Sequence, residues 1–325
     1  MKKQINFSFE SALATDIKGL IAEKRSLGYK YNAHAYVLKE FDSFCIANGF
    51  SCDTITKELS DAWAEQRITE GLNARNVRVR YIKQLSLYIR STGRDAYVPK
   101  SYQSSETKVA HVFSEQELKE FFSAANSLKA SNKKATITIK ECQTLFRLYY
   151  CLGMRLSEPL ELTWENLNLE EGWIKILDSK GHKDRMLWIS DELIDLLKSY
   201  EEFILHSGRD VTFVFPSYVA GKRLSGNTVR EYFNEALEKT SCNGISNPPT
   251  IKSFRHTFVV DRLNSWMEEG TNIQEKLPYL CKFLGHKTIN ETIYYYHQVD
   301  EALKIVRSKD LTANTLIPEV QYDEN

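Results

Sequence analysis

The sequence predicts a mainly α-helical protein, with an N-terminal helical bundle and a second, mainly helical domain that contains a small antiparallel sheet. Apolar residues recur at helical spacing through residues 1–95. Residues 96–112 lack this period, contain Pro99 and a serine-rich patch, and are typical of an exposed linker. Two short β-rich runs interrupt the helical pattern of residues 113–300, and a tail follows at residues 301–325. At 325 residues the chain is long enough for two separate cores.

Four amphipathic segments predict the helices of the first domain. Three of these segments stop beside a glycine, the residue that most often ends a helix. In the fourth helix an apolar stripe, formed by Val77, Tyr81, Leu85 and Tyr88, is predicted to face the core. The expected ranges of the four helices are residues 9–27, 33–47, 56–68 and 73–91.

The distribution of charge singles out the fourth helix. A formal net charge of zero argues at first against a protein that binds nucleic acid. Residues 67–100, however, hold eight lysines and arginines against two acidic residues. Local charge determines whether phosphates are attracted, although a solvated helix face is the alternative interpretation. The candidate phosphate-binding residues are Arg75, Arg78, Arg80, Lys83 and Arg90.

The second domain opens with a helix start signal. Ser114 and Glu117 have the spacing of a capping box, and Phe113 with Leu118 supplies the hydrophobic staple. Two β-rich runs, at residues 173–177 and 186–189, flank a polar segment and predict a hairpin. A short strand is also expected at residues 211–215. The remaining helices are expected at residues 137–152, where Gly153 ends the helix, and at 191–206, 226–239, 254–267 and 273–284.

Composition excludes several classes of protein. No apolar run reaches the length of a membrane span, and residues 1–6 lack the apolar core of a secretory signal. The six cysteines are scattered without a CxxC pair, so neither a disulfide framework nor a zinc site is indicated. We therefore expect a reducing, cytoplasmic location, no metal and no membrane partner. The sequence contains no phosphate-binding P-loop and no nucleophile elbow.

Three short segments of the second domain carry residues suited to phosphate chemistry. Residues 153–158 read GMRLSE, residues 253–258 read SFRHTF, and residues 284–286 read LGH, with Tyr295 nine positions after His286. A guanidinium keeps its charge and donates two parallel hydrogen bonds to one phosphate. Arg155 and Arg255 are therefore a candidate pair of phosphate ligands, although either arginine alone is more often structural.

Together these segments resemble the tyrosine recombinase (phage integrase) family. Residues 153–158 match the family segment G-[LM]-R-x-[ST]-E, and the last segment matches L-G-H-x8-Y. Residues 252–258 match H-x-x-R-H-[TS]-[FA], except that Lys252 replaces the first histidine, as it does in some members. Residues 180–185, KGHKDR, have the form K-G-x-K-x-R of the family's catalytic hairpin. Lys180 is the matching lysine there, and Lys183 is the alternative.

The resemblance implies a reaction as well as a fold. The N-terminal bundle would be a core-binding domain that contacts DNA, and the second domain would be catalytic. Tyr295 would attack a phosphodiester of double-stranded DNA to form a 3′-phosphotyrosine, without metal, cofactor or ATP. The two arginines and the histidine, helped by Lys252, would stabilise the transition state, and Lys180 would protonate the leaving 5′ oxygen. The catalytic residues implied are Arg155, Lys180, Lys252, Arg255, His286 and Tyr295.

The resemblance also implies partners. Four copies, or copies with related recombinase subunits, would assemble on two DNA sites and exchange strands through a Holliday junction. Residues 301–311 are partly apolar at helical spacing, and in the family such a tail packs on the neighbouring protomer. Docking of the tail on its own domain is the alternative. Two alternative functions stay open: an enzyme similar to type IB topoisomerases, and a catalytically inactive DNA-binding accessory protein of the same fold.

Overall fold

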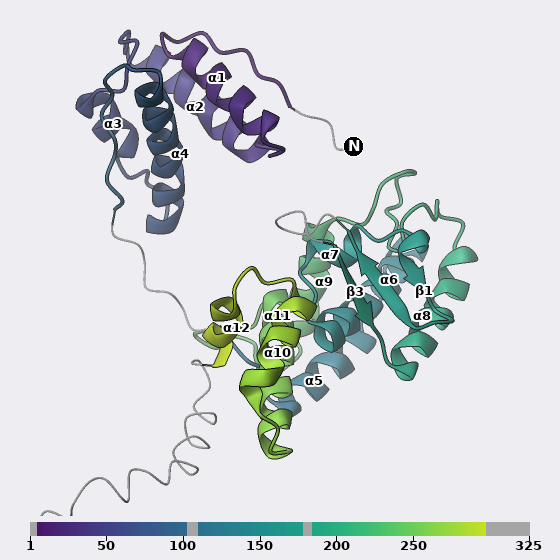
Figure 1. The fold of residues 1–325 in the computed structure, drawn as a ribbon. Helices are drawn as coiled ribbons and strands as arrows, with labels where there is room; N and C mark the ends of the chain where they lie inside the picture. Colours follow the sequence, from purple (N-terminus) through teal and green to yellow (C-terminus); the bar gives the residue numbers. More distant parts are fainter. Residues whose placement is uncertain (1–4, 103–109, 178–183, 297–325) are drawn as a thin grey trace, which may run out of the picture. The chain divides into compact units, whose positions relative to one another are not determined.

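The computed structural model describes residues 5–102, 110–177 and 184–296, with only the main chain described for residues 294–296 (Figure 1). The chain divides into two compact units, Met1–Thr107 and Lys108–Asn325. Both are mainly helical, and the second contains a three-stranded antiparallel sheet, which confirms the predicted fold class. None of the described helices combines the length and apolar composition needed to cross a membrane.

Unit 1 contains the four expected helices: α1 (Ala14–Ser26), α2 (Asn32–Ala47), α3 (Lys57–Ala64) and α4 (Leu72–Ser91). Helix α1 begins later than predicted because the buried Asp42 carboxylate accepts hydrogen bonds from the main-chain N–H groups of Glu10 and Ser11. These bonds hold the preceding segment in a non-helical conformation, although Phe9 still packs into the core.

Helix α3 ends four residues earlier than predicted. Arg75 Nε donates a hydrogen bond to the carbonyl oxygen of Ala64, and the Arg78 guanidinium donates to those of Trp63 and Glu65. The last carbonyls of a helix have no partner within the helix. Arginine side chains from α4 therefore satisfy the end of α3.

The core-facing stripe of α4 lies about one residue away from the predicted one. Tyr81 and Leu85 are buried as expected, but Val77 is 39% exposed. The other buried apolar residues of the helix are Val79, Ile82 and Ile89. The predicted stripe has spacings of four, four and three residues, and the buried residues 78, 82, 85 and 89 fit a helical repeat equally well, so spacing alone does not select the buried face.

The segment after α4 lies on the bundle. Ala96 is buried in the core of unit 1, and Tyr97 N–H donates a hydrogen bond to the carbonyl oxygen of Ile55. The side chain of Asn76 bonds both the N–H and the carbonyl of Tyr102. Residues 96–102 are thus part of unit 1, although the sequence places them in the linker.

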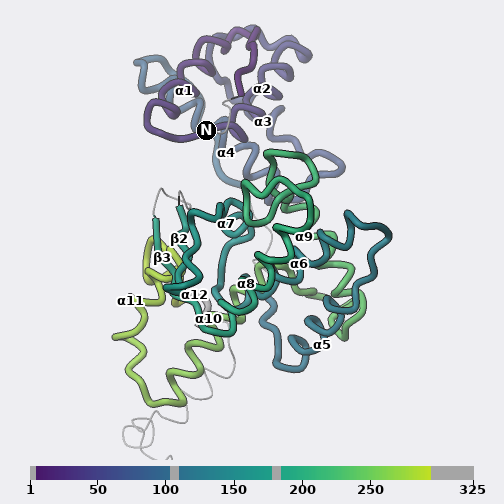
Figure 2. Tube along the Cα trace, turned by 90° about the vertical axis from the view of Figure 1, so that its right-hand side faces the viewer, coloured from purple at the N-terminus to yellow at the C-terminus, as the bar shows by residue number. Residues whose placement is uncertain are grey.

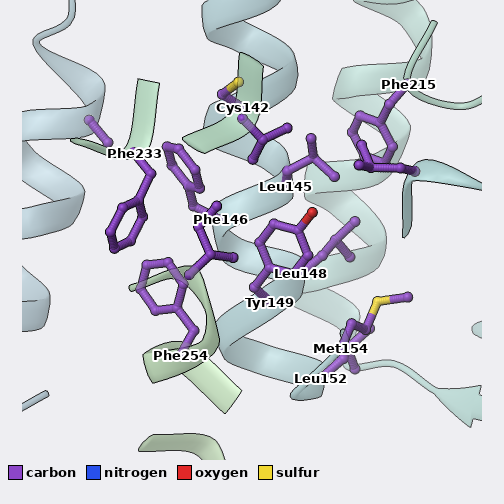
Figure 3. Close-up of a cluster of buried hydrophobic side chains, with 14 of the residues drawn as sticks. Cys142, Leu145, Phe146, Leu148, Tyr149, Leu152, Met154, Phe215, Phe233 and Phe254 are labelled. Atoms are coloured by element: carbon purple, nitrogen blue, oxygen red, sulfur yellow. The ribbon is translucent and has the colours of Figure 1, made fainter. Parts of the chain in front are cut away.

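Unit 2 is built around one long helix. Helix α6 (Lys133–Leu152) contacts α5 (Glu115–Asn126), α8 (Asp191–Leu205), α9 (Gly226–Leu237) and α10 (Ile251–Glu268). Figure 3 shows the centre of this core, where the rings of Phe146, Phe233 and Phe254 gather. The predicted capping box at Ser114 and Glu117 is confirmed at the start of α5.

The sheet of unit 2 has the strand order β1-β2-β3. The predicted hairpin is confirmed as β2 (Trp173–Ile176) and β3 (Arg185–Trp188), in which Ile176 pairs with Arg185 at the inner end of the connecting segment. The two-residue strand β1 (Leu167–Asn168), which follows the 3-10 turn η1 (Trp164–Asn166), is too short to show a period in the sequence.

The strand expected at residues 211–215 is wrong. That segment forms turns, and its hydrogen bonds go to scattered partners: Val214 N–H donates to the carbonyl of Leu162, and the Phe215 carbonyl accepts from Leu224 N–H. A single bridge then joins Pro216 and Arg223. The apolar residues Val214 and Phe215 are buried by packing, without a partner strand.

Three helices complete the chain that the structure describes. The short helix α7 (Ser157–Leu160) follows α6, while α11 (Ile273–Leu284) and α12 (Ile289–Tyr296) follow α10. Figure 2 shows α11 beside strand β3, and the two elements are in contact. Helix α12 packs against both α10 and α11. Strand β3 and helix α11, at least 85 residues apart in the sequence, therefore meet in one region of unit 2.

Candidate active site

Gly153 sets the position of the first arginine. It ends α6 in the left-handed conformation, with φ of 56°. A Cβ atom there would lie 2.6 Å from Cδ1 of Phe258, so any other residue would be both strained and obstructed. The close contact between the end of α6 and α10 places Arg155 against the helix that carries the second arginine.

Arg155 is held on two sides. Its Nη1 donates a hydrogen bond to Glu158 Oε1 at 2.9 Å, and its Nη2 donates to the carbonyl oxygen of Gly285 at 2.8 Å. Its main-chain N–H donates to Glu158 Oε2 at 2.8 Å. Helix α7 has no side-chain cap, and the Glu158 carboxylate orders this junction.

Arg255 lies on α10 and is only 3% exposed. Its Nη1 donates to the carbonyl oxygen of Gly153 at 2.6 Å, and its Nη2 donates to that of Leu284 at 2.8 Å. The same Nη2 lies 2.8 Å from Nε2 of His286. Each arginine thus bonds a main-chain carbonyl beside a different site residue, which interlocks the three segments.

Gly285 places His286 in this cluster. The glycine ends α11 with φ of 66°, and a Cβ atom there would lie 3.1 Å from Nη1 of Arg185 and 3.4 Å from Nη1 of Arg155. His286 is buried, and burial, followed by the charges of Arg255 and Arg155, lowers its pKa to about 3. The imidazole is therefore neutral at physiological pH.

The hydrogen bonds of His286 define its tautomer. A guanidinium can only donate, so Nε2 of the neutral ring accepts from Arg255. The proton then resides on Nδ1, which lies 2.8 Å from Oγ1 of Thr292 on α12. The buried hydroxyl of Thr292 accepts this bond.

Arg185 joins the hairpin to the cluster. Its Nη1 and Nη2 donate to the two carboxylate oxygens of Glu158 at 3.0 and 2.7 Å, and its Nε donates to the carbonyl oxygen of Phe283 at 2.7 Å. The Glu158 carboxylate therefore lies between two arginines, which, with the N–H of Arg155, hold its pKa below the usual range although burial acts in the opposite direction. Arg185 is the first residue of β3, where the segment with the candidate lysines returns to the sheet.

The structure brings Arg155, Arg255 and His286 together. Lys252 is exposed on the first turn of α10, one turn before Arg255. Tyr295 belongs to α12, whose main chain packs on α10 and α11. Lys180 and Lys183 lie outside the described residues. The roles of these four residues stay predictions.

Sequence reasoning missed three residues of this site. Glu158 and Arg185 stand in two different motifs of the sequence. The motifs do not reveal that these two residues, 27 positions apart, form an ion pair. Thr292 stands between His286 and Tyr295 in no recognised motif. Its only sequence signal is its place three residues before Tyr295.

The basic residues of α4 fall into two groups. Arg80 and Arg90 are exposed and Lys83 is half-buried, so the three stay candidates for phosphate contact. Arg78 contradicts its prediction, because it is 5% exposed and pairs with Glu70 at 2.6 Å. Arg75 is half-buried, and its guanidinium stacks 3.8 Å from the ring centroid of Tyr102 while it bonds the end of α3.

One set of side chains among the described residues has the separations of a metal site. The ligand atoms of His111, Glu117 and Cys242 all lie within 4.8 Å of one another. Hydrogen bonds account for this proximity without an ion. His111 Nε2 lies 3.3 Å from one Glu117 oxygen, the Cys242 thiol donates to the other at 3.2 Å, and burial raises the pKa of that thiol to about 12.

Comparison with known families defines the class of this protein. The model of the phage integrase family matches residues 111–302. The chain belongs to the phage integrase family, the class of the tyrosine-type site-specific recombinases. This match includes every element of the arginine and histidine cluster described above.

The similar proteins bear related names. A putative integrase/recombinase, y4rB, of Sinorhizobium fredii is 23% identical over 299 residues, which cover 89% of this chain and 93% of that protein. A probable integrase/recombinase protein, MJ0367, of Methanocaldococcus jannaschii is 30% identical over 161 residues, 49% of this chain and 46% of the relative. The tyrosine recombinase XerD of Staphylococcus saprophyticus is 29% identical over 157 residues, 48% and 49% of the two chains. The match spans about half the length of the latter two.

Solved structures share the fold. XerH recombinase bound to palindromic difH substrate, in a post-cleavage complex, matches with a TM-score of 0.62 and 19% identity over 86% of this chain and 79% of XerH. The Tn1549 transposon integrase in complex with transposon right end DNA matches with a TM-score of 0.62 and 15% identity, over 91% and 99% of the chains.

Proposed function

We propose that this chain is a site-specific recombinase that cuts and rejoins double-stranded DNA through a covalent bond between Tyr295 and a 3′ phosphate. The observation that carries the proposal is the interlocked cluster of Arg155, Arg255 and His286 beside α12, the helix of Tyr295. Membership of the family supports it, as do relatives named as recombinases and integrases.

The cluster suits stabilisation of a phosphoryl transition state. Main-chain carbonyls of residues 153, 284 and 285 hold the two guanidinium groups in place before any substrate arrives. Donors that are already positioned need no reorganisation as charge develops on the phosphoryl oxygens. Arg155, at 25% side-chain exposure, is the more accessible of the two arginines.

His286 must change protonation state to contribute. Its Nε2 accepts a hydrogen bond from Arg255, whereas a phosphoryl oxygen is itself an acceptor. Donation to the phosphate therefore requires a proton on Nε2. A bound anion stabilises the charged imidazolium and raises its pKa. Meanwhile Nδ1–H keeps its bond to Thr292, and the Arg255 guanidinium turns its donor from Nε2 to the phosphate, because two donors cannot share a hydrogen bond.

The remaining roles complete the reaction. Tyr295 gives its hydroxyl proton to water and attacks phosphorus, the bond to the 5′ oxygen breaks, and Lys180 supplies a proton to that oxygen. Lys252 assists at the phosphate from the first turn of α10. The phosphotyrosine conserves the energy of the phosphodiester bond that was broken. A second 5′-hydroxyl can therefore reverse the step without metal or ATP.

DNA binding and assembly are parts of the same proposal. The exposed basic residues of α4, Arg80 and Arg90, together with Lys83, contact the phosphate backbone. Four copies act on two synapsed sites, and residues 301–325 link neighbouring copies. Truncation after Val299 should impair synapsis more than binding to a single site. Full recombination by the truncated protein would contradict the proposed role of the tail.

Covalent trapping tests the proposal. A nicked suicide substrate, from which the cut fragment diffuses away, should accumulate a protein–DNA adduct with the wild type. Tyr295→Phe should abolish the adduct but leave DNA affinity unchanged, whereas Tyr294→Phe and Tyr296→Phe should retain it. A wild type that binds DNA without an adduct would be an accessory protein. Relaxation of supercoiled DNA without four-way junctions would indicate a topoisomerase-like enzyme.

A substrate with sulfur at the leaving position tests Lys180. A thiolate leaves without a proton, so Lys180→Ala should slow cleavage of normal DNA and spare the sulfur substrate. Equal slowing on both substrates would assign another role to Lys180, and Lys183→Ala should then be compared in the same assay.

A further inference from the structure

The imidazole of His286 is bonded from both sides by residues of different helices. Nε2 accepts from Arg255 of α10, and Nδ1 donates to Thr292 of α12 at 2.8 Å. Thr292 is fully buried, with an exposed fraction of 0%. The three hydrogen-bonded side chains thus connect Arg255, a proposed phosphate ligand, to α12, the helix that carries Tyr295.

We propose that Thr292 is a positioning residue that fixes the tautomer and ring orientation of His286 and couples them to the placement of α12. This inference rests on the proposed function and adds a residue to it. Thr292 lies in the first turn of α12, three residues before Tyr295. If α12 shifts along its axis, the bond to Nδ1 breaks before the bond to Arg255 does. Correct seating of the tyrosine helix and correct orientation of the histidine are therefore one event.

The chemistry of the hydroxyl supports this role. A buried N–H without an acceptor loses its bonds to water and gains none, which is unfavourable. With the hydroxyl present, Nδ1–H is satisfied and Nε2 faces Arg255, so a single neutral tautomer is stable. Without it, the other tautomer becomes competitive, but its Nε2–H would point at the N–H groups of Arg255. The positive charges of Arg155 and Arg185 near the ring disfavour relief by protonation.

Three variants separate this role from simple packing. Thr292→Val keeps the shape and removes the hydroxyl, whereas Thr292→Ser keeps the hydroxyl. The matched control is Thr144→Val, because Thr144 is also buried, at 1% exposure, and its hydroxyl donates to the Lys140 carbonyl of its own helix. The measured quantities are the rate of adduct formation at saturating protein, the affinity for DNA, and the ¹⁵N signals of His286, assigned by their loss in His286→Gln.

We expect Thr292→Val to slow adduct formation roughly tenfold or more at unchanged DNA affinity, in proportion to the loss of one buried hydrogen bond. Thr292→Ser and Thr144→Val should stay within about twofold of the wild type, a range that corresponds to much less than one hydrogen bond. In the ¹⁵N spectrum the wild type should show one tautomer with protonated Nδ1, and Thr292→Val should show a mixture.

Two results overturn the inference. In the first, Thr292→Val forms the adduct as fast as Thr144→Val. In the second, the ¹⁵N spectra of the wild type and of Thr292→Val both show a single His286 tautomer with protonated Nδ1. Failure of the proposed function looks different, since the wild type itself would then form no adduct. Because the ¹⁵N spectrum requires no DNA, it decides the link between Thr292 and His286 in that case too.

Discussion

Two buried arginine–glutamate pairs in unit 2 have the same nitrogen–oxygen distance, but the pKa values of their glutamates are shifted in opposite directions. Arg185 pairs with Glu158 at 2.7 Å in the candidate active site, and Arg209 pairs with Glu141 at 2.7 Å elsewhere in the unit. The pKa of Glu158 is lowered, whereas burial raises that of Glu141 to about 8. Burial of an ion pair therefore does not by itself determine the charge state of its acid.

The difference arises from the number of hydrogen-bond donors. Both oxygens of Glu158 accept bonds, from two arginines and a main-chain N–H. Glu141 has fewer donors: its Oε2 accepts from Arg209 at 2.7 Å, and Thr138 adds a smaller contribution. A buried carboxylate stays ionised when donors replace the water that it has lost. The site thus keeps a full negative charge between its arginines, and this charge holds both of them in place.

The largest contrast is expected from removal of each carboxylate charge. Glu158→Gln leaves the guanidinium groups of Arg155 and Arg185 without their counter-ion, and it should lower the rate of adduct formation roughly a hundredfold. It should also destabilise the protein by about 3 kcal/mol. Glu141→Gln replaces an acid that is largely protonated already, so its effect on both quantities should be small. Urea unfolding and single-turnover cleavage measure the two effects.

Equal losses in Glu158→Gln and Glu141→Gln would show that the two pairs are alike and that the site pair has no special role.

Arg185→Lys and Arg209→Lys extend the comparison. Lysine keeps the charge but cannot bond both oxygens of Glu158 and the Phe283 carbonyl at once. Only the substitution at Arg185 should slow cleavage.

Unit 1 repeats the contrast between structural and exposed arginines within one helix. Arg78 lies in a buried pair with Glu70, 4.9 Å from the ring centroid of Trp63, whereas Arg80 is exposed. Arg78→Met should destabilise the protein by about 3 kcal/mol, because it leaves the Glu70 charge and the carbonyl groups of Trp63 and Glu65 without this donor. Arg80→Met should change stability by less than about 0.5 kcal/mol. Similar unfolding curves for the two variants would contradict the assignment.

The sequence predicts most of the helices and the hairpin because these depend on local periodicity and on capping residues. It also predicts which motifs carry Arg155, Arg255 and His286. It cannot show that Arg78 is buried, since the residue is charged and its partners precede it by 8 to 15 residues. The strand expected at residues 211–215 has the right composition but no partner strand. Pairing across the fold is a tertiary property, and for the same reason the roles of Glu158 and Thr292 appear only in the structure.

The two glutamates should also give opposite dependences of stability on pH. The raised pKa of Glu141 means that its contribution is fully present below about 4.5 and is lost as pH rises through about 8. The lowered pKa of Glu158 means that its contribution is present above 4.5 and is lost as pH falls through its folded-state value. Urea midpoints of the wild type should therefore fall between pH 6 and pH 9 more than those of Glu141→Gln. Parallel midpoints would indicate an ionised Glu141.

The smallest expected effect concerns the exposed residue of the α4 pair. Arg80→Ala removes one side chain that can contact a phosphate, and each such contact releases about one counter-ion when DNA binds. The logarithm of the binding constant should therefore depend less steeply on the logarithm of salt concentration, by about one in slope, on any DNA sequence. Lys57→Ala, an exposed lysine that pairs with Asp61 on α3, is the matched control and should leave the slope unchanged. If Arg80→Ala leaves the slope unchanged as well, DNA lies on another face of unit 1, and the exposed arginines of α4 are a solvated surface.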